Sequence, residues 1–360
     1  MGFYAALALN WAVFSPVAKA MDDYSFTDFY YGILDATGER DTSNIVTIVD
    51  MTELTNRRDL AYLIADIEDL HPKVLGVDIV FEGLKEDSVG DMLLTEVVQN
   101  CHNAVFSYKL IEGTDGQSIH SFFMPCDSVQ EGFTNMPRQL YGGMKRSLNI
   151  GRQFGNCLRP SFIKLVADVY ADCELLPLAD RELKINFSPI HYRVVPFDSI
   201  QENAGFLEDH IVLLGAMKEE ADMHYTPQGK VAGVVLLAYA IETMIHQNQI
   251  RELPVWMTVL VSYMVVLVWV MFIACYTQQI TQKSDWIRLL LSASLIRGFW
   301  MFLWMALVVW IAFILFCQYD ISVNMAPAIA ATAFIANANN LYEILTKLII
   351  RKKKDEYEKN

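Results

Sequence analysis

Five residues of this sequence have side chains suited to binding a polar ligand: Asp50, Asp78, Asp222, His224 and Thr226. Asp50 and Asp78 each follow an apolar run with the composition of a buried strand, and the other three follow a third such run. Open parallel sheets bind ligands at the carboxyl ends of their strands. If the three runs are neighbouring strands, these side chains build one acidic crevice for a cation, a metal ion or a polyol, with His224 as a further metal ligand.

The same residues also have structural interpretations. An aspartate at the end of a strand commonly caps the following turn. Three basic residues stand near Asp50 and Asp78 in the sequence as partners for ion pairs, namely Arg57, Arg58 and Lys73. His224 needs no ligand role if it is a surface histidine. The residue types leave the binding and the structural interpretation open.

The sequence lacks the patterns that are typical of enzymes. It contains no G-x-S-x-G, H-E-x-x-H, P-loop or dinucleotide-binding motif. Gly142-Gly143 lacks the strand–turn–helix context of a phosphate-binding loop. Acidic residues at a sheet edge do not specify a reaction. We therefore expect no catalytic residues and no cofactor, and a metal-dependent enzyme using the acidic cluster is the least favoured interpretation.

Alternating strands and helices must position these residues. The predicted strands are residues 45–49, 74–81, 104–110, 183–187, 192–195 and 210–215. The predicted helices, from apolar residues at helical spacing, are residues 57–70, 88–99, 160–170 and 233–247. This order predicts right-handed crossovers and an α/β domain with a mainly parallel sheet. Residues 112–160 break the pattern and predict hairpins or an insertion.

Long apolar segments flank this domain, which we place at residues 22–252. Residues 1–21 read as an N-terminal transmembrane helix or a signal anchor, because about 20 apolar residues span a bilayer. Residues 253–350 contain three apolar spans, at residues 255–276, 298–318 and 322–340. The sequence therefore predicts an all-α transmembrane bundle after the α/β domain.

Basic residues indicate the orientation, because cytoplasmic loops are enriched in lysine and arginine. The basic tail at residues 351–360, together with Lys283, Arg288 and Arg297, is expected in the cytoplasm. The three spans then place the α/β domain outside. Residues 286–296 are either a helix lying at the cytoplasmic interface or the start of a long tilted span.

Charge and cysteine content limit the partners and the chemistry. The net charge of −14 at pH 7 argues against a nucleic-acid partner, which needs a basic surface. No C-x-x-C spacing supports a zinc site. Four cysteines of the outer domain could form two disulfides in an oxidising compartment or remain free thiols: Cys101, Cys126, Cys157 and Cys173.

Four segments of the outer domain together resemble a known family. They are the strand before Asp50, residues 58–81, the run Gly132-Phe133-Thr134-Asn135, and residues 211–234 with their Thr226-Pro227-x-Gly229 turn. Their order and spacing, followed by three apolar spans, are similar to the CHASE2 domain, an extracytoplasmic sensory module of bacterial signalling proteins. Two family elements differ here: residues 54–57 replace a Trp-Pro-Trp-like element, and residues 142–146 match an Asp-Gly-Arg-like element only loosely.

The resemblance implies a bacterial membrane-anchored sensory or ligand-binding protein. We expect it in the inner membrane as a multi-pass protein with its main domain periplasmic or extracellular. Because residues 351–360 are too few for an output domain, such a sensor would act through a separate partner. The alternative is a non-catalytic structural or docking subunit of an envelope complex. The expected partners are membrane lipid and either a second copy of the chain or other envelope proteins.

Overall fold

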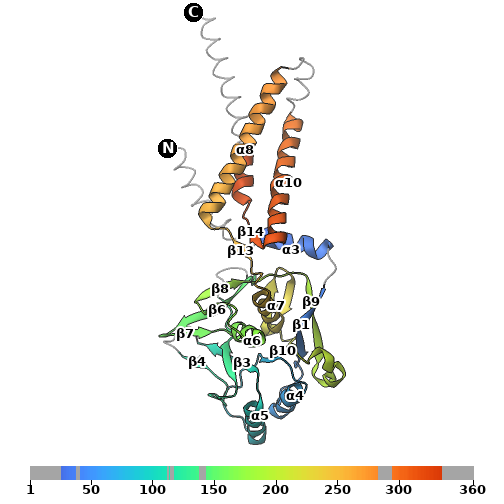
Figure 1. Ribbon diagram of the computed structural model, residues 1–360, viewed down its shortest axis with the longest axis vertical. Helices are drawn as coiled ribbons and strands as arrows, with labels where there is room; N and C mark the ends of the chain where they lie inside the picture. Colours follow the sequence, from blue (N-terminus) through green and yellow to red (C-terminus); the bar gives the residue numbers. More distant parts are fainter. Residues whose placement is uncertain are drawn as a thin grey trace, which may run out of the picture. The chain divides into compact units, whose positions relative to one another are not determined.

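The computed structural model describes residues 26–37, 41–111, 113, 117–137, 143–282 and 294–334 (Figure 1). The chain divides into two compact units, Met1–Ile250 and Arg251–Asn360. The first unit contains a mixed α/β domain, and the second contains two long apolar helices. The predicted α/β domain with apolar C-terminal helices is therefore confirmed at this level.

A seven-stranded sheet forms the centre of the first unit, in the order β4-β3-β2-β10-β1-β9 with β5 also paired to β3. Its pairings are parallel except that of β4 with β3. The sheet is thus mainly parallel, as predicted. Its strands are β1 (Asp41–Asp50), β2 (Val74–Val77), β3 (Ala104–Leu110), β4 (Ser118–Ile119), β5 (Gln130–Phe133), β9 (Ile190–Pro196) and β10 (Ile211–Gly215).

Helices cover both faces of this sheet. They are α4 (Arg57–Glu68), α5 (Ser88–Asn100), α6 (Phe162–Ala171) and α7 (Gly233–His246). Leu75 and Val77 of β2 share a buried core cluster with α4 and α5. The residue between them, Gly76, lies against α6, where a Cβ would meet Phe162 and Val166. Because successive strand residues point to opposite faces, the apolar runs are buried on both sides of the sheet.

The remaining elements of the first unit lie outside this sheet. A three-stranded antiparallel sheet consists of β6 (Ser147–Phe154), β7 (Cys157–Pro160) and β8 (Arg181–Lys184). A hairpin pairs β11 (Met223–Thr226) with β12 (Gly229–Ala232). The helix α3 (Phe26–Thr37) and the 3-10 turns η1 (Phe197–Ser199), η2 (Gln201–Phe206) and η3 (Glu220–Asp222) complete the unit. The sequence did not predict α3.

The predicted strand at residues 74–81 is too long, because β2 ends at Val77. The Asp78 backbone N–H still donates to the Leu214 carbonyl at 2.9 Å, so Asp78 lies at the carboxyl end of this central strand. Farther along, the Phe81 N–H donates to the Ser121 hydroxyl at 3.2 Å. The apolar residues after Asp78 therefore leave the sheet, although their composition is that of a strand.

Gly132 is required where β5 meets the start of α6, because a Cβ there would overlap the backbone of Ser161 and Phe162. We expect Gly132→Ala to destabilise the protein by about 1–3 kcal/mol, the usual cost of overpacking. Gly32→Ala is the control, since nothing lies within 4 Å of a Cβ at that helical position. Urea unfolding of the full chain measures both. Equal midpoints for the two variants would contradict the expected clash.

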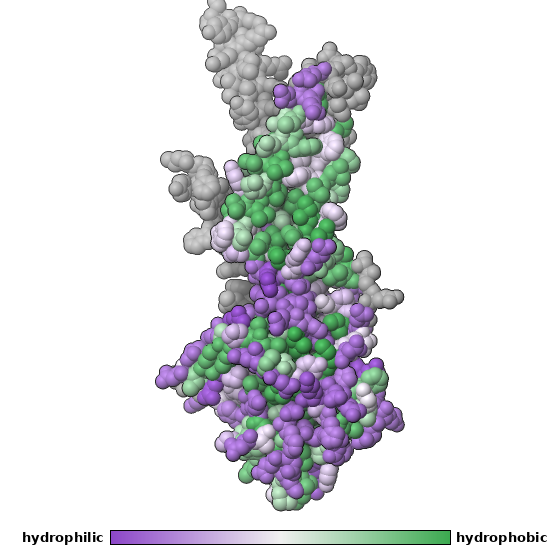
Figure 2. Space-filling model, in the orientation of Figure 1, coloured by the Kyte–Doolittle hydropathy of each residue, from purple (hydrophilic) through white to green (hydrophobic). Residues whose placement is uncertain are grey.

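The second unit contains α8 (Val255–Thr281) and α10 (Ser294–Tyr319), joined by a short parallel pairing of β13 (Arg251–Glu252) with β14 (Ile321–Ser322). Both helices are long and apolar enough to cross a membrane. Aromatic rings join them: the centroids of Trp269 and Trp304 lie 6.0 Å apart. Figure 2 shows mainly hydrophobic surface over these helices, whose apolar side chains are largely exposed.

Several predicted segments lie partly or wholly outside the described residues. The N-terminal segment at residues 1–21 and the basic tail at residues 351–360 are among them. Of the proposed interfacial helix at residues 286–296, only the last residues are described, and they belong to α10. Of the predicted third span at residues 322–340, the described part includes a helix at residues 326–334.

Candidate functional site

Asp50 holds the turn after β1 in place. One carboxylate oxygen, Oδ1, accepts hydrogen bonds from the backbone N–H groups of Thr52 at 2.9 Å and Met217 at 3.3 Å, and from the Thr52 hydroxyl. The Lys218 ammonium lies 4.0 Å from the other oxygen. Asp50 thereby ties the loop after β1 to the loop after β10. The structure shows the turn role for Asp50.

Asp78 and Asp222 meet in one cluster at the carboxyl end of the parallel sheet. Burial, and next the negative charge of Asp222, raise the pKa of Asp78 to about 7, while Lys109, a hydrogen bond from the Ser107 hydroxyl and His224 act in the opposite direction. A carboxyl with such a pKa is partly protonated at neutral pH. This cluster, of Asp78, Ser107, Lys109, Asp222 and His224, is called the Asp78 cluster below.

Strand register explains why Ser107 and Lys109 join this cluster. In the parallel pairing of β2 with β3, Val77 lies opposite Phe106, so that the next pair is Asp78 and Ser107. Side chains alternate along a strand, which places Lys109 on the same face as Ser107. The sequence analysis missed both residues. Alternation along β3 could have shown that Ser107 and Lys109 share a face. It could not show that this face lies beside Asp78, because the sequence does not say which strands are neighbours.

Asp222 forms the mouth of the cluster, since its side chain is 41% exposed and that of His224 is 19% exposed. The Asp222 Oδ1 atom lies 3.4 Å from His224 Nε2. Its carboxylate packs against Gly233, at the first turn of α7, where a Cβ would not fit. A carboxylate is favourable at this position because the N-terminus of a helix carries partial positive charge.

His224 and Thr226 have different surroundings. The Nε2 atom of His224 is buried without a hydrogen-bond partner among the described residues, apart from its proximity to Asp222. The Thr226 hydroxyl donates to the Gly229 carbonyl at 2.9 Å and accepts from the Gln228 N–H at 3.2 Å. Thr226 therefore closes the β11–β12 turn, in which Gly229 has a positive φ of 100°. Only His224 of this pair contributes to the cluster.

The basic residues that were candidate partners of Asp50 and Asp78 bind other acids. Arg57 pairs with Asp91, Arg58 with Asp87 and Lys73 with Asp172. Within the part of the chain that the structure describes, no group of three or more His, Cys, Asp and Glu side chains is arranged to hold a metal ion.

The four cysteines considered for disulfides are free thiols in the structure, as are Cys275 and Cys317. Cys101 and Cys126 belong to the same core cluster, whereas Cys157 and Cys173 are exposed. Burial, together with the nearby Glu68 and Cys126, raises the pKa of the Cys101 thiol well above its usual range. Such a thiol is protonated and unreactive at neutral pH.

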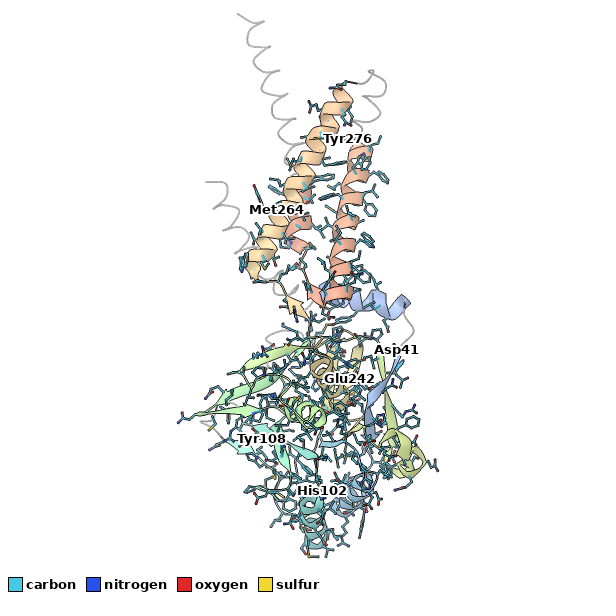
Figure 3. The ribbon with its side chains drawn as sticks, viewed as in Figure 1. Asp41, His102, Tyr108, Glu242, Met264 and Tyr276 are labelled. Atoms are coloured by element: carbon cyan, nitrogen blue, oxygen red, sulfur yellow. The ribbon has the colours of Figure 1, made fainter. Side chains whose placement is uncertain are left out.

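A cavity of about 590 Å³ lies at the opposite, amino-terminal end of the parallel strands. The ends of α4 and α6 and the turns before β2, β3 and β10 line it, with the residues Glu68, His71, Pro72, Lys73, His102, Asn103, Tyr170 and Asp209. Figure 3 labels His102, near α4 and α5. Burial raises the pKa of Glu68, although a hydrogen bond from the His102 backbone opposes the effect. The sequence analysis did not consider this end of the sheet.

Glu242 is a buried acid that the sequence analysis missed, on the mainly apolar α7 (Figure 3). It accepts hydrogen bonds from the Ser43 hydroxyl at 2.5 Å and the Tyr192 hydroxyl at 2.9 Å. Burial and the charge of Glu242 raise the pKa of Tyr192 well above its usual range. These contacts join α7 to β1 and β9, so Glu242 has a structural role.

Comparison with protein families gives one match. The model of the CHASE2 domain matches residues 6–278, which include the whole α/β domain and most of α8. A search of the curated proteins found no match, and neither did a search of the solved structures. The family resemblance seen in the sequence is therefore confirmed.

Proposed function

Because this chain belongs to the CHASE2 domain family, whose members are extracytoplasmic sensory domains, we propose that it is a membrane-anchored sensor that binds a small cationic ligand at the Asp78 cluster. The observation that carries this proposal is the pairing of Asp78 with Asp222 at the carboxyl end of the sheet, where the charge of Asp222 adds to burial in raising the pKa of Asp78. Parallel sheets commonly bind ligands at that edge. Binding, not catalysis, is the role proposed for this cluster.

Charge explains the preference for a cation. The repulsion between the two carboxylates is relieved when a positive group enters between them. Asp222 is exposed enough to meet that group first, and Asp78 is half-buried. Bound positive charge would also lower the pKa of Asp78, so that binding near pH 6 releases a proton. Cation binding and proton release are thus coupled.

The proposed route from ligand to output runs through the membrane helices. Asp222 packs against the first turn of α7, so a ligand that moves its carboxylate also acts on that helix. The exposed apolar side chains of α8 and α10 suit contact with lipid or with another membrane protein. We propose an inner-membrane, multi-pass protein of bacteria that passes its signal to a separate partner.

Titration calorimetry of the full chain in detergent, with Ca²⁺, Mg²⁺ and putrescine as probes, tests the site. We expect at least one probe to bind, and its heat to depend on the buffer at pH 6 but hardly at pH 8.5, because only the lower pH leaves a proton on Asp78 to release. Asp78→Asn and Asp222→Asn should each weaken binding by about tenfold or more, since each removes one charge of the pair.

Asp50→Asn is the matched control, because Asp50 ends a neighbouring strand but serves a turn. It should leave the affinity unchanged. If none of the probes binds, or if the Asp78 and Asp222 variants bind like the unmodified chain, the cluster is not a cation site.

A further inference from the structure

Ser118, His120 and Glu131 form a hydrogen-bonded chain beside β3, on the face of Tyr108 and not on that of Ser107 and Lys109. The Ser118 Oγ atom lies 2.6 Å from His120 Nε2. On the other side of the ring, His120 Nδ1 lies 2.5 Å from Glu131 Oε2. This order of hydroxyl, imidazole and carboxylate is the arrangement that activates a serine in hydrolases.

The sheet fixes the three residues in this arrangement. Ser118 belongs to β4, which runs antiparallel to β3 with Ser118 opposite Leu110. Glu131 belongs to β5, which runs parallel to β3 with Glu131 opposite Phe106. His120 directly follows β4. Two strands that share one edge of β3 therefore bring Glu131 to Ser118 and His120, although these residues are distant in the sequence.

Two further contacts orient the imidazole and the carboxylate. The His120 ring stacks on Tyr108, labelled in Figure 3, with the centroids 4.6 Å apart and the planes at 17°. The other oxygen of Glu131 accepts from the Ser121 N–H at 3.3 Å. The Glu131 side chain is only 9% exposed, whereas that of His120 is 40% exposed. The acid is held inside the chain, and solvent reaches the imidazole.

The geometry assigns the tautomer of a neutral His120. A carboxylate only accepts hydrogen bonds, so Glu131 fixes the ring proton on Nδ1. The lone pair of Nε2 then faces the Ser118 hydroxyl and can take its proton. We propose that Ser118 is a nucleophile, with His120 as general base and Glu131 as its positioning residue, and that it hydrolyses small carboxylic esters that reach it from solvent.

The proposed reaction balances with an ester and water. The Ser118 oxygen attacks the ester carbonyl as its proton moves to His120 Nε2. The bond from the carbonyl carbon to the alkoxy oxygen breaks, and the proton on His120 passes to the departing alcohol. Water, with its proton taken by His120, then cleaves the acyl-serine, which releases the carboxylic acid and restores Ser118.

A fluorophosphonate probe tests this nucleophile on the full chain in detergent. Attack by Ser118 would form a phosphorus–oxygen bond and expel fluoride, and mass spectrometry locates the adduct. We expect modification at Ser118, its loss in Ser118→Ala, and a labelling rate lowered by about 10²-fold or more in His120→Ala, because general bases contribute that much. Glu131→Gln should lower the rate less.

Ser199→Ala is the matched control, because the Ser199 hydroxyl donates to the Asp198 carboxylate at 3.0 Å and has no imidazole partner among the described residues. It should not change the labelling. The release of p-nitrophenol from p-nitrophenyl acetate gives a second readout, with an initial burst equal to the protein concentration. An unlabelled chain with intact circular dichroism, or labelling that is unchanged in His120→Ala, overturns the proposal. Neither result bears on the cation site.

Discussion

Asp78→Asn is expected to stabilise the protein at pH 8 and to have little effect near pH 4. The pKa of Asp78 is raised to about 7, mainly by burial and by Asp222, so the folded chain holds a proton that the unfolded chain has lost. Between about pH 4 and pH 7 the folded state binds more protons, and stability therefore falls as pH rises. The total change is on the order of 4 kcal/mol. Asparagine removes the charge and with it this dependence.

The measurement is the free energy of urea unfolding of the full chain, for both proteins, at a series of pH values. The difference between the variant and the unmodified chain isolates Asp78, because all other groups are shared. The Asp50→Asn control, which alters a turn, should not reproduce the gain in stability expected of Asp78→Asn at pH 8. A constant difference for Asp78→Asn across this range would contradict the raised pKa.

Removing one partner of the buried Arg57–Asp91 ion pair is expected to destabilise the protein by about 3–5 kcal/mol, because the remaining charge is left uncompensated. The two side chains are only 8% and 7% exposed. Arg57 also donates to the carbonyls of Glu82 at 3.0 Å and Gly83 at 2.8 Å. The pair therefore joins α4, α5 and the loop between β2 and α5.

The pKa of Asp91 shows whether its hydrogen bonds outweigh the cost of burying its charge. Burial would raise it, but the hydrogen bonds from Arg57 and from the Lys85 backbone N–H outweigh burial, so that the pKa of Asp91 is lowered. A lowered pKa means that this contribution to stability is present at neutral pH. It is lost in acid, as pH falls from the unfolded value through the folded one.

A double-variant cycle separates the ion pair from the packing. Arg57→Met and Asp91→Leu should each be strongly destabilising, and the double variant should cost less than either, because it leaves no unpaired buried charge. Arg58→Met with Asp87→Leu is the matched exposed pair, since Arg58 and Asp87 are 46% and 35% exposed. That surface pair should contribute far less than the buried pair, because solvent screens its charges. Additive effects at Arg57 and Asp91 would show that the pair is not coupled.

Local patterns in the sequence predicted most elements of the first unit. The helix predicted at residues 57–70 is α4, and the strand predicted at residues 104–110 is β3 with the same bounds. These predictions succeeded because apolar residues recur at regular spacing wherever one or both faces of a helix or strand are buried. The strand predicted at residues 183–187 belongs instead to the separate antiparallel sheet, because composition does not state which strand pairs with which.

The grouping of these polar residues was predicted in part. The sequence placed Asp50, Asp78, Asp222, His224 and Thr226 at one edge of a sheet. The structure brings Asp78, Asp222 and His224 together and uses Asp50 and Thr226 for turns. Aspartate and threonine side chains accept backbone N–H groups in turns as readily as they bind ligands. Their residue types therefore do not separate the two roles.

The sequence by itself determined the class of the protein: an α/β domain of the CHASE2 family followed by helices that can span a membrane. These features follow from composition and from periods of two and 3.6 residues, which are local properties of the chain. Only the tertiary structure decided which charges meet. Ser107 and Lys109 joined Asp78, Asp91 joined Arg57, and Glu131 joined His120 through strand register and helix packing. Contacts between distant segments depend on which strands pair and which helices pack together, and the local sequence pattern does not specify either.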